Sequence, residues 1–302
     1  MRCMLFTVIA LMAFAGGFLP AASWGAEVRL VGSDLLGVEF SKALHEFGGR
    51  NDLQFKLAFD GSRPGRDALL AGKADLAFLT LPSAEMNFGD ALQVLTVAYH
   101  RVVVLASAGC PLERIAFSQL EEIFGANART TVPRSGSERK EADEWVNQLA
   151  VLAPETGHGI ALEYFRHVVL RGGDLKPRVQ RYREIATLQH RFREQGHVLA
   201  LAADFPEELP AARMVAVAAT PDAPAFLPTA ENLHRGDYPL RLPVCVVFRR
   251  DDASRLSAVL GFLTSEAAMP HFKRAGVVPL PAAVHSRQLA THEKGDFGNR
   301  QK

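Results

Sequence analysis

The sequence predicts an α/β protein built as two lobes with a ligand cleft between them. Apolar strands alternate with amphipathic helices from residue 27 onward, and a Gly/Ser turn follows each of the first two strands. This order of strand, turn, helix and strand favours a parallel sheet. The 302 residues, less an N-terminal leader, are enough for two lobes of ordinary domain size. A cleft between lobes is the usual place for a small ligand.

The first predicted strand, 27–31, leads into a helix that begins after Ser33 and ends at Gly48. Serine is a favoured N-cap residue, and glycine is a common stop signal. One face of this helix is apolar at spacings of i, i+4, i+7, i+8 and i+11. The side chains on that face are Leu36, Phe40, Ala43, Leu44 and Phe47.

The second strand, 54–59, is followed by the stretch DGSRPGRDALLAGKADLAF at 60–78. We expect Gly61 and Ser62 to form a turn, residues 68–71 a short helix that ends at Gly72, and residues 74–80 a buried strand. Arg63 and Arg66 stand on the turn. They are either anion ligands or solvated loop charges, and the residues alone leave both interpretations open.

Residues 94–106 form a long extended run, and Ser118-x-x-Glu121 is a capping box that opens a helix through Phe124. Helices are predicted at 160–170 and around 185–192, strands at 198–202, 214–218 and 242–248, and a Pro-rich connection at 219–236. Two helical segments follow, the second starting near Ser265. The predicted first lobe therefore comprises 27–105 and 238–285, and the second lobe 106–237. Residues 286–302 are a polar tail.

The N-terminus has the pattern of an export signal, which predicts a periplasmic location. Arg2 is followed by an apolar run, and Ala21 and Ser23 offer a small-x-small cleavage site, so 1–26 reads as a signal peptide. The alternative is an uncleaved membrane anchor, although glycines and a proline break the run short of the roughly 20 apolar residues that a spanning helix needs. The remaining cysteines, Cys110 and Cys245, are either buried thiols or one disulfide.

The composition excludes several function classes. A net charge of +1 argues against a nucleic-acid partner, which would select a basic surface. The ten histidines include no H-x-x-x-H or H-E-x-x-H pair, and no nucleophile–base constellation is apparent. We therefore expect no metal site, no cofactor and no enzyme activity.

Four stretches resemble the phosphate-type periplasmic solute-binding proteins of ABC transport systems. They are DGSRPGRDALLAGKADLAFLT, YHRVVVLASAGCPLERIAFSQLEEIFGA, YPLRLPVCVVF and FLTSEAAMPHFKRAGVVPLP, and they occur in the order and spacing of that family. The resemblance covers most of residues 27–281 and marks a divergent member. It implies a type-2 periplasmic-binding-protein fold that closes on a ligand, with the protein acting as a monomer that delivers solute to transporter membrane subunits.

The resemblance also implies that hydroxyls, helix N-terminal N–H groups and an arginine hold an oxyanion. The first two ligand loops then correspond to Gly32–Ser33 and Gly61–Ser62, with Arg63 beside the second. The third corresponds to Thr80–Leu81, which keeps a hydroxyl but lacks the arginine usual in the family. N-terminal helix N–H groups favour anions whatever the ancestry.

The fourth loop corresponds to 153–158, where Thr156, Gly157 and His158 are the predicted ligand residues and the usual arginine is absent. An alternative alignment to RSGS at 134–137 restores an arginine, but it leaves the helix near Gly159 without its usual lead-in. Loss of an arginine from a buried dianion site costs several kcal/mol unless another group replaces it.

Two functions are consistent with these patterns. The first is an exported binding protein that captures phosphate or a similar small oxyanion. The second is a binding-protein-like domain that has lost phosphate binding and serves as a sensor or protein-interaction module, or takes another solute.

Overall fold

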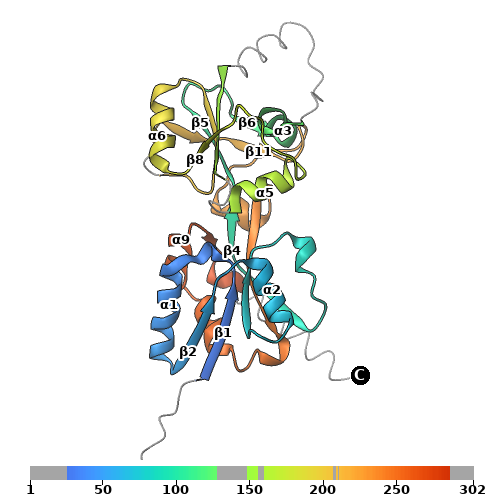
Figure 1. Cartoon of the computed structure of the whole chain (residues 1–302), viewed down its shortest axis with the longest axis vertical. Helices are drawn as coiled ribbons and strands as arrows, with labels where there is room; N and C mark the ends of the chain where they lie inside the picture. The colour runs from blue at the N-terminus through green and yellow to red at the C-terminus, as the bar shows by residue number, and fades with distance from the viewer. Residues whose placement is uncertain (1–25, 128–147, 156–159, 207–208, 210, 286–302) are drawn as a thin grey trace, which may run out of the picture.

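The protein consists of two lobes stacked along its long axis and joined by a narrow neck (Figure 1). The computed structural model describes residues 26–127, 148–155, 160–206, 209 and 211–285. The predicted signal peptide, apart from Ala26, and the predicted tail lie outside these residues. Ala26 is the first residue of a strand. No described helix is long and apolar enough to cross a membrane.

A six-stranded mixed sheet forms the centre of the first lobe. Its strands, in spatial order, are β13 (Val278–Pro279), β4 (Leu92–Arg101), β12 (Arg241–Arg249), β3 (Leu76–Leu79), β1 (Ala26–Gly32) and β2 (Leu53–Ala58). β1 pairs in parallel with β2 and β3, as the sequence predicts, whereas β12 runs antiparallel to β3 and β4. The parallel part places the carboxyl ends of three strands at one edge.

Helices cover both faces of this sheet. α1 (Gly37–Arg50), α8 (Ser257–Leu263) and α9 (Met269–Arg274) contribute to the core on one face, and α2 (Ser62–Leu70) contributes to the core on the other. A 3-10 turn, η1 (Asp34–Leu36), precedes α1, and Ser33 caps it by accepting a hydrogen bond from the Leu35 N–H. α1 extends two residues past the predicted stop at Gly48, and α9 begins four residues after Ser265.

The prediction that α2 covers only 68–71 is wrong, because the helix already begins at Ser62. Pro64 lies in its first turn, where a missing N–H costs no hydrogen bond. The Gly61–Ser62 turn is therefore the N-terminus of a helix of nine residues.

The second lobe is built on a five-stranded sheet and a small two-stranded one. The larger sheet has the order β10 (Ala212–Met214), β5 (Val103–Ser107), β9 (Val198–Ala202), β7 (Ala150–Pro154) and β8 (Gln180–Tyr182), and the smaller pairs β11 (Ala216–Ala218) with β6 (Arg114–Ala116). The predicted single strand at 214–218 is thus split between two sheets. The helices of the second lobe, within the described residues, are α3 (Phe117–Phe124), α5 (Ile160–Val168), α6 (Ile185–Glu194) and α7 (Ala230–Arg235).

Two further predictions for this lobe are wrong. Ser118 is not the N-cap of α3: β6 runs directly into the helix, Ala116 takes the N-cap position, and its N–H donates to Gln119 Oε1 at 2.9 Å. The Pro-rich connection contains α7, whose first turn is capped by Thr229. Cys110 and Cys245 are buried free thiols in different lobes, so the disulfide alternative is excluded.

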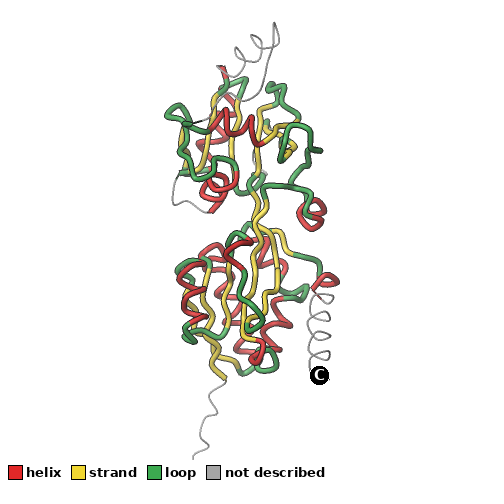
Figure 2. The backbone as a smooth tube through the Cα atoms, turned by 90° about the vertical axis from the view of Figure 1, so that its right-hand side faces the viewer, coloured by secondary structure: helices red, strands yellow, loops and turns green. Residues whose placement is uncertain are grey.

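The neck consists of two adjacent chain segments that cross between the lobes (Figure 2). The extended run predicted at 94–106 is divided at Val102, where the chain leaves the first sheet as β4 and enters the second as β5. The Val102 N–H donates to the Leu240 carbonyl at 3.0 Å, and the Tyr238 hydroxyl donates to the Val102 carbonyl at 2.6 Å. The returning segment therefore holds the outgoing one at the point of crossing.

His100 lies buried beside this crossing. Neither ring nitrogen has a hydrogen-bond partner among the described residues. Burial lowers the pKa of His100 to about 4, and the neighbouring Arg101 adds to the effect. Charging this side chain in the folded protein is therefore unfavourable.

Acidification should destabilise the protein through His100. Its folded pKa lies below the usual 6.5, so the unfolded chain binds the proton first and stability falls as the pH drops from about 6.5 towards 4. We expect a loss of about 2 kcal/mol between pH 7 and pH 4.5 that is absent in His100→Leu. Urea unfolding at both pH values measures it, and His45→Gln, on the exposed side of α1, is the control. An unchanged loss in His100→Leu would contradict this assignment.

Asp75, just before β3, forms hydrogen bonds to Arg29 of β1 and to Arg255, just before α8. Its carboxylate accepts hydrogen bonds from the Arg29 N–H at 2.8 Å, from the Arg29 guanidinium at 2.8 and 3.1 Å, and from Arg255 at 3.0 Å. Burial alone would raise the pKa of Asp75, but the hydrogen bonds from Arg29 and the charge of Arg255 outweigh it and lower the pKa to about 2.

This network should stabilise the protein above pH 4 and be lost as the pH falls from about 4 to 2, because the folded pKa is below the ordinary 3.8. Asp75→Asn should lower the free energy of unfolding at pH 7 by about 2 kcal/mol. Denaturant melts of the variant and of Glu46→Gln, an exposed acid on α1, test the assignment. Equal effects of the two substitutions would rule it out.

Candidate functional site

Three predicted ligand loops of the first lobe meet at the carboxyl edge of its parallel strands. Ser33 follows β1, Ser62 follows β2 by a short loop, and Thr80 follows β3. Ser33, Ser62, Arg63 and Thr80 line one cavity of about 480 Å³, whose other wall includes Ile160 of the second lobe. The sequence therefore identified four residues that the fold brings together.

Close backbone packing creates this arrangement. Gly32 has a φ of +129°, and a Cβ there would lie 1.9 Å from the Phe78 carbonyl oxygen. A Cβ on Gly65 would lie 2.5 Å from the Gly32 Cα, so the first turn of α2 rests directly on the end of β1. The Gly61 N–H donates to the Gly32 carbonyl at 2.8 Å, and the Ser33 N–H donates to Phe78 at 2.8 Å. Glycine is required where two backbones approach this closely.

The hydroxyl groups at this edge differ in what they bind. Ser62 Oγ accepts from the Thr80 N–H at 2.9 Å, and Ser33 Oγ accepts from Leu35. Thr80 Oγ1 is buried and has no hydrogen-bond partner among the described residues. Burying a hydroxyl without a partner costs about 1–3 kcal/mol, so such an atom at the edge of a cavity marks a place for a ligand.

The N-terminus of α2 adds backbone donors to the same edge. By helix geometry, the N–H groups of Ser62 and Arg63 have no acceptor within the helix, and Pro64 has no N–H. The Gly61 and Ser33 N–H groups are already used in packing, as described above. The backbone thus offers two donors to a bound anion rather than a full ring.

Both arginines of the second loop are engaged by one acid, Glu85 of η2 (Ser83–Met86). The Arg63 guanidinium donates to the two carboxylate oxygens at 2.9 and 3.1 Å, and Arg66 lies 3.4 Å from the same carboxylate. The hydrogen bond raises the pKa of Arg63 and lowers the pKa of Glu85. Sequence reasoning missed Glu85, because nothing in the local pattern indicates that it reaches back to α2.

Helix α5 of the second lobe supplies the opposite wall. Arg63, Thr80, Glu163, Tyr164 and His167 are among the residues around a second cavity of about 320 Å³. Glu163 lines both cavities and introduces a carboxylate that the sequence did not predict. The Tyr164 hydroxyl donates to the Arg241 carbonyl at 2.5 Å, which ties α5 to the neck.

The remaining predicted residues, Thr156, Gly157 and His158, lie outside the described part of the chain. Glu155, just before them, accepts from Arg183 at 2.9 and 3.1 Å and is not among the residues that line these two cavities. Arg166, on the cleft side of α5, donates to the Gly173 carbonyl and to Asp174, at 3.1 and 2.8 Å. The described residues contain no cluster of three or more potential metal ligands.

Solved structures of other proteins share this architecture. The structure matches that of a possible phosphate binding protein from Planctomyces limnophilus with a TM-score of 0.67 at 18% identity, over 89% of this chain and 99% of that one. It matches an ABC-type phosphate transport receptor from Vibrio cholerae with a TM-score of 0.64 at 16% identity, over 85% and 100% of the two chains. The chain has the fold of a two-lobed periplasmic binding protein.

A third match to this binding-protein fold is PstS from Borrelia burgdorferi, with a TM-score of 0.66 at 12% identity, over 84% of this chain and 98% of that one. No family model and no curated protein matches the sequence. The fold expected from the resemblance is confirmed, at identities that establish the fold alone.

Gly65→Ala should test whether the packing of α2 on β1 holds the site together. The added Cβ would force α2 away from Gly32 and strain the bond between Ser62 and Thr80, which we expect to cost about 1–3 kcal/mol of stability. The matched control is Gly261→Ala on α8, where a Cβ meets nothing within 4 Å. That change should be neutral or stabilise by up to about 1 kcal/mol, because alanine favours helix. Urea unfolding that shows the same effect for both would disprove the packing argument.

Proposed function

We propose that the protein is a solute-binding protein that captures a small oxyanion, phosphate being the first candidate, in the cleft between its lobes. The observation that carries this proposal is the buried hydroxyl of Thr80, which has no hydrogen-bond partner among the described residues and lies at the edge where the α2 N-terminus and Ser33 also converge. A tetrahedral oxyanion has several acceptor oxygens and would satisfy this hydroxyl and the helix N–H groups together.

The first lobe would bind the ligand first, and α5 of the second lobe would complete the site when the lobes close. A ligand favours the closed state only if it makes additional contacts there. Ile160 and Glu163 line the cavity opposite the three loops. Closure of the lobes would bring these two residues nearer to the ligand. Thr156, Gly157 and His158, the predicted residues of the fourth loop, remain part of the proposed ligand set on the basis of the sequence alone.

Arg63 would contribute by exchanging partners. Its guanidinium lines both cavities and holds the Glu85 carboxylate through two hydrogen bonds. This is the geometry in which arginine also binds the oxygens of phosphate. An incoming oxyanion would replace Glu85 at Arg63, while Arg66 keeps Glu85 paired.

Export to the periplasm, a monomeric state and delivery to ABC-transporter membrane subunits belong to the same proposal. The N-terminal pattern of residues 1–26 supports export, and the likeness in fold to an ABC-type phosphate transport receptor supports the transport role. We continue to expect no enzyme activity.

The second candidate is a domain that has lost phosphate binding and serves as a sensor, an interaction module or a binder of another solute. Two carboxylates favour it: Glu163 lines the cleft, and Glu85 occupies the arginines of the second loop. The carboxylate of Glu163 would repel a dianion in the same cavity.

Calorimetric titration distinguishes the two candidates. The full chain is first unfolded and refolded to remove carried-over ligand. It should then bind inorganic phosphate or sulfate with a Kd of about 1 μM, which corresponds to a binding free energy of roughly 8 kcal/mol. Thr80→Val should leave stability unchanged or improve it, because it removes an unsatisfied hydroxyl, and should weaken binding about ten-fold. Thr187→Val, exposed on α6, is the control.

Glu85→Gln provides the opposite expectation. It removes the charge that competes for Arg63, so anion affinity should rise by about ten-fold, whereas Arg63→Ala should lower it by a similar factor. If a folded sample shows no heat of binding with either anion, the oxyanion-binding function is excluded and the second candidate, a domain that has lost phosphate binding, is favoured. Binding that none of these substitutions alters would refute the residue assignment.

A further inference from the structure

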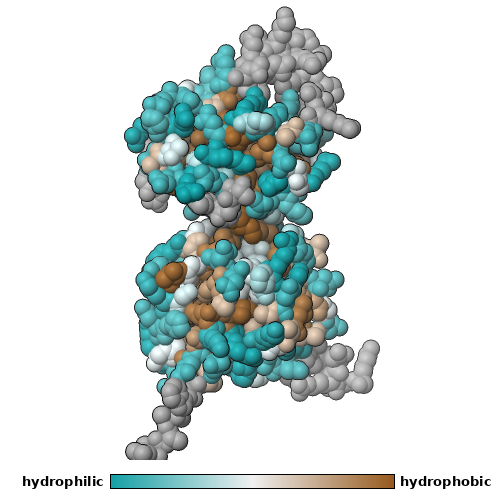
Figure 3. All heavy atoms as spheres, in the orientation of Figure 1, coloured by the Kyte–Doolittle hydropathy of each residue, from teal (hydrophilic) through white to brown (hydrophobic). Residues whose placement is uncertain are grey.

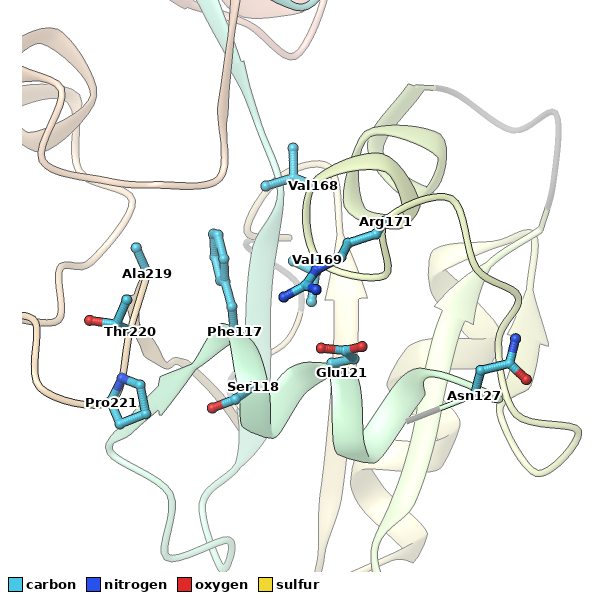
Figure 4. A pocket seen from close by; sticks show the side chains of 10 residues that line it. All are labelled: Phe117, Ser118, Glu121, Asn127, Val168, Val169, Arg171, Ala219, Thr220 and Pro221. Atoms are coloured by element: carbon cyan, nitrogen blue, oxygen red, sulfur yellow. The ribbon is translucent and has the colours of Figure 1, made fainter. Parts of the chain in front are cut away.

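A third cavity, of about 520 Å³, lies wholly within the second lobe and shares no lining residue with the two inter-lobe cavities. It is bounded by the first turns of α3, by the end of α5 and the residues after it, and by the loop at 219–221 (Figure 4). This volume is within the range of small-molecule sites.

Two opposite charges face this cavity. Figure 4 shows the Arg171 guanidinium, from the turn after α5, and the Glu121 carboxylate, from α3, turned toward the same space. Neither side chain forms an ion pair or a hydrogen bond with another described residue. Arg171 also has a φ of +52°, a left-handed conformation that is uncommon for a residue with a side chain.

The same wall carries an unsatisfied hydroxyl. Ser118 Oγ is buried and has no hydrogen-bond partner in the described part of the chain. It lines the cavity at the second residue of α3, a helix of eight residues.

Apolar side chains complete the lining. Phe117 of α3 stands between Ala219 and the end of α5, where Val168 and Val169 lie (Figure 4). Phe117 and Val168 are half-buried, so part of their surface remains available for contact with a ligand. The cavity therefore combines one positive group, one negative group, two hydroxyls, an amide and an apolar wall.

We propose that this cavity binds a small zwitterion with an apolar body, of the class of α-amino acids. Its carboxylate would pair with Arg171 and accept from Ser118, its ammonium group would pair with Glu121, and its side chain would pack on Phe117 and Val168. The site is distinct from the cleft, and the proposal does not depend on the proposed anion-binding function.

The two opposite charges argue against simpler ligands. An inorganic anion in the cavity would face Glu121, and a cation would face Arg171. A neutral apolar molecule would remove both charges from water without pairing them, which is unfavourable. A zwitterion of this class can pair with both side chains at once, because its ammonium group and its carboxylate are attached to the same carbon atom.

Titration calorimetry of the refolded full chain with L-phenylalanine and L-leucine tests the proposal. We expect saturable binding of at least one of them, and binding about ten-fold weaker or more for phenylacetate, which lacks the ammonium group, and for phenethylamine, which lacks the carboxylate. Flat traces with both amino acids overturn the proposal. So does equal binding of phenylacetate and L-phenylalanine.

Two variants locate the binding. Arg171→Asn removes the guanidinium while keeping a residue that tolerates left-handed backbone, and it should weaken amino-acid binding about ten-fold. Ser118→Ala should also weaken binding, yet leave the thermal stability of the free protein unchanged or raised, which a purely structural hydroxyl would not do. The matched control is Arg193→Gln, an exposed arginine on α6.

The two sites remain separable in these experiments. Amino-acid binding that Arg171→Asn leaves intact, or that Thr80→Val abolishes, places the ligand in the cleft and overturns the proposal. Loss of amino-acid binding in Arg171→Asn with unchanged phosphate titration supports it. Absence of phosphate binding would affect only the proposed function, since no residue of this cavity lines the cleft.

Discussion

The double crossing of the chain at Val102 is the constraint on which the rest of the structure depends. One segment leaves the first lobe there and another returns beside it, and the bonds of Val102 to Leu240 and Tyr238 hold the two together. Each lobe buries its own apolar clusters on both faces of its sheet. The lobes are therefore separately packed bodies that share a narrow neck (Figure 3), and the two cavities that residues of both lobes line lie between them.

Within the first lobe, the position of the candidate site follows from backbone packing rather than from charge. The approach of Gly65 to Gly32 seats α2 on the end of β1, and the same contact brings Ser62 against Thr80. This packing uses several backbone donors, and Thr80 Oγ1 is buried without a hydrogen-bond partner in the described part of the chain. The free-energy cost of that hydroxyl is consistent with a site that is completed by a ligand.

The charges around the cleft are balanced in a way that the family resemblance does not imply. Arg63 is paired with Glu85, and Arg166 is paired with Asp174, while Glu163 stands on the wall opposite the hydroxyls. A ligand must therefore displace a carboxylate from an arginine or carry less charge than a dianion. The fold therefore provides the shape of the cleft, whereas these charged side chains determine which ligand it can accept.

The sequence by itself determined the α/β class and the parallel start of the first sheet. Both follow from local rules: apolar periodicity marks the elements, and the order of strand, turn, helix and strand favours parallel pairing. That Ser33, Ser62 and Thr80 belong to one site was implied by the resemblance to phosphate-type binding proteins, not by a local rule. The local pattern misjudged the start of α2, since proline occurs in turns and also in the first turn of a helix, and it misjudged the N-cap of α3, which is Ala116 rather than Ser118. Only the tertiary structure decided that Glu85 occupies Arg63, that Glu163 faces the cleft, and that Glu121 and Arg171 share a cavity. Such pairs form between side chains distant in sequence, and their energies depend on distance and burial, which no local pattern contains.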